Sequence, residues 1–338
     1  MKFLNHWIAI ALACGALTAE NSRGQDTDAP PAETPVTYKV LDLQRGPYEL
    51  KMLDNSDTYS QALAINSGGA IIGQREGANE DKTIFRIDYF FFDGEHYHTM
   101  PAVKGFTNAE AIALSDTNIV VGYASRVIGH PDGSLIAVAW EPLKERITAL
   151  PRPEGDISTH AQSISADGNR ITGYSSGSER MRPVVWTRGE DDQWLITVLP
   201  TIMNENPYIM SSRTMISPDG KLVAACCTAD LSNGVYDSDL FVWREKDGNW
   251  EREHVSATQF YIRGVNNAGK IVGSLSTPRG KRLPCVVDIE DGDVKPIALL
   301  PGDTFGEALG INADGVVVGF SDDLSGEEGG PQPFIWRD

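Results

Sequence analysis

The chain has 338 residues, with 29 Lys or Arg against 47 Asp or Glu, so its formal net charge is −18. Hydrophobic residues make up 41% of it, which is ordinary for a protein with a sizeable buried core. This acidity excludes the basic surface of a nucleic-acid-binding protein and makes anionic lipid a poor partner. No apolar run reaches the roughly 20 residues of a membrane-spanning helix, so we expect a protein that does not span the membrane.

The N-terminus has the layout of a secretory signal peptide. A basic residue precedes an apolar stretch over residues 7–18, which ends in small residues and predicts a signal peptide over residues 1–19. A cut before Cys14 would instead give a lipid-anchored envelope protein. Residues 20–37 are polar and proline-containing, and we expect a disordered tether there. The protein is therefore expected to be secreted or periplasmic, with the lipid-anchored form as the alternative.

One sequence pattern recurs six times along the rest of the chain. Each copy has an apolar segment, an Asn or Ser, a tight turn such as Asp314-Gly315, and a β-branched segment that ends in a small residue. The copies end at Gly73, Gly122, Gly173, Ala225, Gly273 and Gly319. A glycine at the same place in a sheet predicts that another backbone or side chain packs closely against it. The spacing of 46 to 52 residues is that of a propeller blade with four strands.

The second half of each copy predicts two more strands. The third carries a core residue, an aromatic in five copies: Phe92, Trp140, Trp186, Trp243, Val287 and Trp336. The fourth often closes at Leu-Pro, as at Leu150-Pro151, and the last copy stops before it. A strand over residues 38–43 is expected to supply the missing one. The fold prediction is an all-β, six-bladed β-propeller of four-stranded blades over residues 38–338, with the N-terminal strand closing the last blade.

Two segments of the last copy resemble a known family. Residues 308–319 (ALGINADGVVVG) and 333–336 (PFIW) are similar to the probable extracellular HAF repeats, and the resemblance extends over residues 38–338. The His-Ala-Phe that names the family is replaced here by Gln-Pro-Phe, Arg-Pro-Val or Leu-Pro-Cys. The resemblance implies an exported bacterial protein with no defined activity.

The candidate binding residues come from the start of each first strand. The second-to-third loops, such as 74–86 and 228–238, are longer and more varied than the first-to-second turns, so we expect function on the face where they open. Counting back four residues from the core aliphatic gives one polar residue per copy, expected around the channel mouth: Gln61, Glu110, His160, Ser212, Tyr261 and Glu307. The alternative is that these residues only hydrogen-bond loop backbone and water.

Metal and cofactor sites are not predicted. His96 and His98 would lie on one face of a strand and could hold a metal, but the spacing fixes no third ligand. The acidic turns over 190–192 and 288–293 lack the ligand spacing of a calcium loop. We expect exposed, solvated residues at each of these places.

Three cysteines remain after removal of the signal peptide, which is an odd number for an exported chain. Either Cys285 forms a disulfide with Cys226 or Cys227, or the thiols are free and buried.

The sequence contains no nucleophile elbow, no H-E-x-x-H zinc motif and no phosphate-binding glycine loop. This favours an exported, non-enzymatic binding or scaffold protein that recognises a protein, peptide or glycan on its top face. The alternative is a polysaccharide lyase or hydrolase that acts at the channel mouth through His160, Tyr261, Glu110 and Glu307. A strongly shifted pKa at His160 would favour the enzyme. A third possibility, a purely structural envelope repeat, requires no binding site.

Overall fold

The computed structural model describes residues 60–78, 85–126, 135–177, 181–200, 209–231, 235–255, 260–277, 281–323 and 330–337. The chain divides into two units, Met1–Thr37 and Tyr38–Asp338, and all described residues belong to the second. The predicted signal peptide, tether and closing strand lie outside the described residues. Among the described residues, no helix has the length and apolar character needed to cross a membrane.

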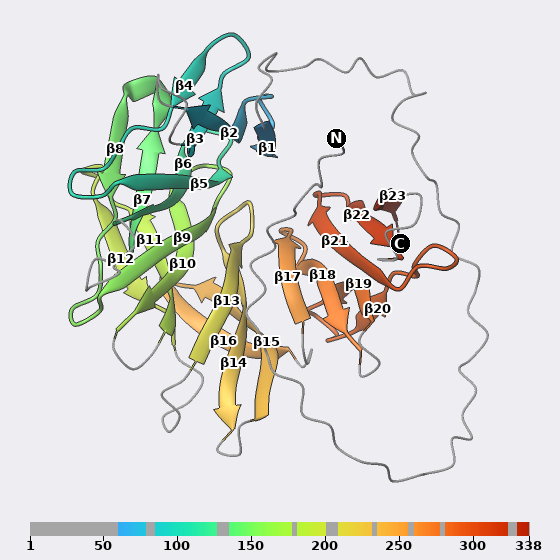
Figure 1. The fold of residues 1–338 in the computed structure, drawn as a ribbon. Coiled ribbons are helices and arrows are strands. Elements are labelled where there is room, and N and C mark those ends of the chain that lie inside the picture. Colours follow the sequence, from blue (N-terminus) through green and yellow to red (C-terminus); the bar gives the residue numbers. More distant parts are fainter. Residues whose placement is uncertain are drawn as a thin grey trace, which may run out of the picture. The chain divides into compact units, whose positions relative to one another are not determined.

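The described residues form an all-β fold whose strands follow one another through successive antiparallel sheets (Figure 1). The first sheet contains β1 (Ser60–Ile65), β2 (Ile71–Ala78), β3 (Phe85–Phe92) and β4 (Tyr97–Thr99). The second contains β5 (Asn108–Leu114), β6 (Val120–Ser125), β7 (Leu135–Glu141) and β8 (Arg146–Ala149), with a short 3-10 turn over Pro142–Lys144. The third contains β9 (Ser158–Ile164), β10 (Arg170–Ser176), β11 (Met181–Arg188) and β12 (Trp194–Val198). The fourth contains β13 (Ile209–Ile216), β14 (Leu222–Leu231), β15 (Val235–Lys246) and β16 (Asn249–Val255).

The last sheet has seven strands and combines two copies of the repeat. Its members are β17 (Phe260–Val265), β18 (Lys270–Ser276), β19 (Arg282–Asp288), β20 (Val294–Pro296), β21 (Phe305–Ile311), β22 (Val317–Asp322) and β23 (Gln332–Trp336). A single parallel bridge between Arg282 and Phe305 joins the two copies. The last copy thus has three strands among the described residues, as its sequence predicts.

Two of the predicted long loops are largely strand, which corrects the sequence analysis. In the loop expected over 228–238, β14 continues to Leu231 and β15 already begins at Val235, with Asp230 paired to Tyr236. The loop expected over 74–86 is shortened in the same way by β2 and β3. Antiparallel strands pair through their backbones and can carry polar side chains. Strand pairing therefore continues through the polar residues of these two hairpins.

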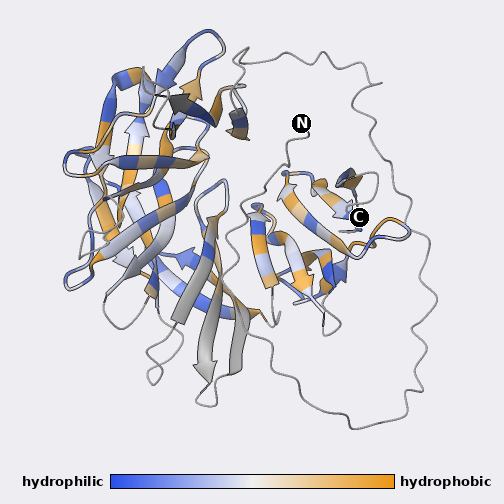
Figure 2. Cartoon of the chain, viewed as in Figure 1, coloured by the Kyte–Doolittle hydropathy of each residue, from blue (hydrophilic) through white to orange (hydrophobic). Residues whose placement is uncertain are grey.

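Buried residues of neighbouring sheets form the core. Trp140, Trp186 and Trp243 are fully buried, as predicted, and Val287 takes the same place in the fifth copy. Phe92 and Trp336 are only half buried, contrary to the prediction. In the first sheet Phe91 points into the core instead. Figure 2 shows hydrophobic residues recurring between polar ones along the strands, as expected for sheets that pack on their neighbours.

The repeated Leu-Pro pair joins one sheet to the next. The Leu150 amide donates to the Ala137 carbonyl at 2.8 Å and so ends its own sheet. The carbonyl of Pro151 accepts a hydrogen bond from Trp186 Nε1 of the following sheet at 2.8 Å. Pro200 and Trp243 repeat this bond at 3.0 Å. A buried indole N–H needs an acceptor, and the Leu-Pro turn of the preceding copy provides it.

Candidate binding site along the first strands

The first strands of the sheets, β1, β5, β9, β13, β17 and β21, pack against one another in that order. Five of them contain a β-bulge, which begins one residue after the predicted site residue. On β5, for example, Glu110 pairs with Tyr123, and the register then shifts between Ala111 and Ala113. Bulges re-aim side chains at the place where they occur, so these strands present their site residues in similar ways.

The repeated glycine is explained by this bulge. A Cβ on Gly122 would lie 1.8 Å from the carbonyl oxygen of Glu110, and a Cβ on Gly173 would lie 1.9 Å from that of His160. Gly273 and Gly319 meet the carbonyl oxygens of Tyr261 and Glu307 at 2.0 and 2.1 Å. The predicted close packing against the glycine is therefore confirmed, and its partner is the backbone of the site residue.

The fourth copy has Ala225 in place of glycine, and its bulge lies at a different register. Ala225 pairs directly with Thr214, and the shift falls between Ser211 and Thr214. Ser212 and Arg213 therefore occupy the bulge together. The side chain of Ser212 lies outside the described residues, whereas that of Arg213 is half buried.

One group of side chains, the tyrosine cluster, surrounds Glu110 and His160. It consists of Tyr89, Glu110, Tyr123, His160 and Tyr174. The hydroxyls of Tyr89 and Tyr123 both donate hydrogen bonds to the Glu110 carboxylate. Burial, together with this carboxylate, raises the pKa of both tyrosines well above the usual value. Both phenols therefore stay protonated and remain donors at neutral pH.

His160 lies between two tyrosine rings. Its ring centroid is 4.1 Å from that of Tyr123 and 5.1 Å from that of Tyr174, with which it is nearly parallel. Burial lowers the pKa of His160 to about 4, and the positive charge of Arg213 adds to this effect. The imidazole is therefore neutral at neutral pH. Its Nδ1 atom is buried and has no hydrogen-bond partner within the described part of the chain.

A second group, the arginine cluster, surrounds Glu307. It consists of Arg213, Tyr261, Arg263, Arg282 and Glu307. The Glu307 carboxylate is buried and pairs with Arg263, whose Nη2 lies 2.7 Å from Oε2, and with Arg282 through Oε1. The Arg282 guanidinium lies 4.1 Å from the ring centroid of Tyr261. The cluster thus contains three guanidinium groups and one carboxylate.

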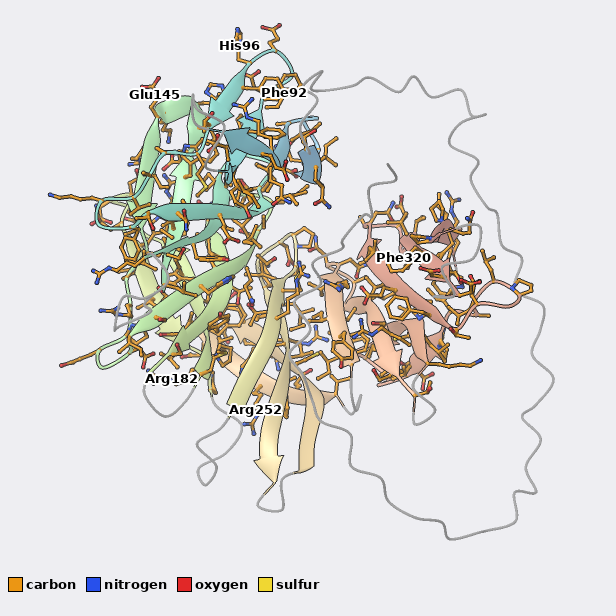
Figure 3. The ribbon with its side chains drawn as sticks, viewed as in Figure 1. Phe92, His96, Glu145, Arg182, Arg252 and Phe320 are labelled. Atoms are coloured by element: carbon orange, nitrogen blue, oxygen red, sulfur yellow. The ribbon has the colours of Figure 1, made fainter. Side chains whose placement is uncertain are left out.

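Aromatic rings extend this cluster on its side at β21 and β22. Arg282 also lies over the ring of Phe305, at 5.4 Å, and Phe305 contacts Phe320 at 5.7 Å between centroids. Figure 3 labels Phe320 among the side chains of these strands.

Arg213 connects the two clusters. Burial lowers its pKa, the charge of Arg263 lowers it further, and Glu307 acts in the opposite direction. The same guanidinium acts on His160. Arg213, on the strand between His160 and Arg263, is therefore electrostatically coupled to both clusters. We call the two clusters together the polar stripe.

Four of the six predicted residues belong to the polar stripe: Glu110, His160, Tyr261 and Glu307. Gln61 lies outside it, where its side chain accepts a hydrogen bond from Gln74 at 3.3 Å.

Several stripe residues were missed by sequence reasoning, and some carried a signal. Tyr123 and Tyr174 directly follow repeated glycines and pair with Glu110 and His160. Arg263 is the bulge residue, two positions after Tyr261. The remaining stripe residues, Tyr89, Arg213 and Arg282, had no such marker.

The other candidate residues are engaged in local contacts. His98 and His96 both approach Asp93, at 3.3 and 3.7 Å, and Figure 3 shows His96 at the tip of its hairpin, pointing away from the sheet. In the acidic turns, Asp192 pairs with Arg146 and Arg188, and Glu290 pairs with Arg244. No cluster of three metal-ligating side chains occurs among the described residues.

A pocket of about 250 Å³ lies at the opposite ends of the strands, beside the first-to-second turns. Its charged lining residues include Glu141, Lys144 and Arg188. Lys144 and Arg188 both pair with Glu141, and Asp167, a further charged lining residue, accepts hydrogen bonds from Ser165 and Asn169, so each of these charges is held by local contacts. The polar stripe is therefore the stronger candidate.

Cys226 and Cys285 are buried in the same core cluster, and neither forms a disulfide. Burial raises the pKa of Cys285 to about 12, so its thiol is not a nucleophile at neutral pH. Of the two alternatives, buried thiols are confirmed for this pair, and the disulfide between them is wrong. The side chain of Cys227 lies outside the described residues.

No family model matches the chain, and no curated protein matches it. Similar solved structures exist, however. The β-propeller domain of the Trilobed protease from Pyrococcus furiosus, described as having an open velcro topology, is 12% identical with a TM-score of 0.55, over 82% of this chain and 81% of that one. An acylaminoacyl peptidase from Pyrococcus horikoshii is 13% identical with a TM-score of 0.54, over 82% of this chain and 45% of that one. One of two prolyl endopeptidases is 14% identical with a TM-score of 0.51, over 86% of this chain and 41% of that one.

This chain thus spans less than half of the length of each peptidase. At these identities the likeness concerns the fold alone. Together with the antiparallel sheets described above, it shows an all-β fold of the propeller type.

Proposed function

We propose that this chain is an exported β-propeller of the HAF-repeat kind that binds a protein, peptide or glycan along the polar stripe and performs no chemistry on it. Six blades are supported by the six copies of the repeat. The propeller neighbours support a scaffold on which binding groups are mounted. Export is supported by the N-terminal sequence alone.

Apolar side chains are exposed on the first and the last sheet, which supports closure of the sheets into a ring. Val318 on β22 is 46% exposed, whereas the residues at its place in the other copies are fully buried: Ile72, Val121, Thr172, Ala224 and Val272. At the other end, Ile65 on β1 is 68% exposed. Apolar faces of this kind become covered when the last blade, completed by residues 38–43, meets the first.

The polar stripe is the observation that carries the binding proposal. It places two carboxylates, three guanidiniums, an imidazole and four phenols on neighbouring first strands and the strands beside them, most of them partly or fully buried. Convergent polar groups with a shifted pKa, set on a rigid scaffold, are typical of ligand sites. Tyr261, which is 42% exposed beside Arg282, is of the residue type that dominates binding energy in interfaces.

The contacts of the stripe favour binding over catalysis. His160 has the shifted pKa that the enzyme alternative requires, but burial is its main cause and none of the described carboxylates orients the ring. Glu110 accepts from two tyrosines, and Glu307 is neutralised by two arginines. A general acid or base must be able to exchange a proton with substrate, and these groups are committed elsewhere.

A thermal-shift screen of the purified chain against pools of peptides, oligosaccharides and divalent ions tests this proposal. A ligand at a hundredfold excess over its dissociation constant stabilises the fold by about 2.7 kcal/mol. We expect a hit whose shift disappears in Tyr261→Ala and persists in Tyr97→Ala, which truncates a tyrosine of similar exposure, 38%, on β4. A shift that survives Tyr261→Ala would move the site away from the stripe. Turnover of the bound ligand would favour the lyase or hydrolase.

A further inference from the structure

Arg213 differs from the other arginines of the polar stripe in its partners. Arg263 and Arg282 both pair with Glu307. The Arg213 guanidinium forms no hydrogen bond or ion pair with any side chain in the described part of the chain, although it is half buried on β13. A partly buried charge without a partner is costly, so an uncompensated guanidinium of this kind calls for an explanation.

A shortage of acidic residues is not the reason. The chain has 47 acidic against 29 basic side chains. Arginines elsewhere hold a carboxylate within hydrogen-bonding distance, among them Arg146, Arg170, Arg182, Arg188 and Arg244. Among the residues that the structure describes, by contrast, no side chain pairs with the guanidinium of Arg213.

The surroundings of Arg213 add to this positive charge. Arg263, on the neighbouring strand β17, acts on it as a like charge, and Glu307 compensates only in part because it already pairs with two guanidiniums. His160, on the other neighbouring strand, has a buried Nδ1 without a partner among the described residues, and its ring takes part in a hydrogen bond with the Ala161 backbone. Arg213 is thus the one guanidinium of the stripe that no described carboxylate holds, with the like charge of Arg263 on the next strand.

We propose that Arg213 receives an oxyanion of the ligand, a carboxylate, phosphate or sulfate group, with Arg263 adding positive charge beside it. The inference rests on the proposed binding function and names the chemical class of the ligand. A guanidinium offers a planar fork of N–H donors that matches such groups in two-point geometry. The acidic remainder of the protein would repel other parts of an anionic ligand, so the anion is directed to this one position.

Binding of acetate, inorganic phosphate and sulfate to the purified full chain, measured by calorimetry at constant ionic strength with chloride as the background anion, tests the proposal. We expect saturable binding of at least one of the three, weakened about tenfold or more in Arg213→Gln. Arg213→Lys, which keeps the charge and loses the fork, is expected to fall between the two. The acetate arm reports a carboxylate ligand, and the phosphate and sulfate arms report a phosphorylated or sulfated one.

Arg152→Gln is the matched control, since Arg152 is exposed and its Nη1 donates to the Ile157 carbonyl at 2.7 Å. It should leave anion binding unchanged. Absence of saturable binding, or equal affinities for wild type and Arg213→Gln, would overturn the proposal. A screened ligand that depends on Tyr261 and not on Arg213 would also overturn it, while leaving the binding function intact.

Discussion

Glu110 and Glu307 occupy the same place in their repeats and have opposite surroundings. Each precedes a bulge, and the carbonyl oxygen of each lies over a repeated glycine. Glu110 is half buried and accepts from two phenols, whereas Glu307 is buried and pairs with two guanidiniums. Equivalent backbone thus carries two different electrostatic environments.

The difference arises from a few neighbouring positions. The bulge residue of the preceding first strand is apolar Leu63 in the case of Glu110 and cationic Arg263 in the case of Glu307. The residue paired with the carboxylate is Tyr123 in one copy and Phe320 in the other. A repeated scaffold can therefore change the chemistry of its surface through the bulge residue and the residue after the glycine, with no change in the strands.

Replacing Glu110 and Glu307 in turn is the strongest test of whether their surroundings differ. Glu307→Gln removes the counter-charge of Arg263 and Arg282, which are half buried, and we expect it to lower the free energy of unfolding by about 2–3 kcal/mol. Glu110→Gln keeps an acceptor for the two phenols and should cost only about 1 kcal/mol. Chemical denaturation of both variants measures the difference. Equal losses would mean that the two environments do not differ as described.

The same backbone bulge occurs in both clusters, and a substitution at the repeated glycine tests it. Gly173→Ala would place a methyl group 1.9 Å from the His160 carbonyl oxygen, and such overpacking costs about 1–3 kcal/mol. The reverse change in the fourth copy, Ala225→Gly, adds no atom and only removes a buried methyl group, so it should cost about 1 kcal/mol through strand entropy and lost packing. Denaturation midpoints of the two variants give the comparison. A Gly173→Ala variant as stable as wild type would remove the bulge as the reason for the glycine.

Much of the scaffold could be predicted from the sequence because it repeats. The turns, the period and the buried Trp140, Trp186 and Trp243 follow from local patterns that recur with the fold. The close approach at the repeated glycine was predicted as well, although its partner was not. Four of the six candidate residues lie in the polar stripe because the counting rule selects the residue before each regular bulge, and their role in binding stays a prediction.

The remaining features depend on contacts that a local pattern does not contain. In the fourth copy the bulge has another register, so the rule gave Ser212, and Ala225 in place of glycine was the available sign. Arg282 reaches Glu307 from β19, a strand of the preceding copy, and only packing between copies brings these two together. Residues 228–238 were taken as a loop because they lie between the expected second and third strands, whereas β14 and β15 continue through most of this segment.

An NMR titration of His160 in the full chain tests most directly whether the polar stripe is one connected site. Histidine signals are assigned with His160→Gln and followed against pH in wild type and in Arg213→Gln. We predict a pKa of about 4 in wild type and a higher pKa in the variant, because the Arg213 charge disfavours the imidazolium. A wild-type pKa near the ordinary 6.5, unchanged by Arg213→Gln, would show that the imidazole is neither buried in the tyrosine cluster nor coupled to the arginine cluster.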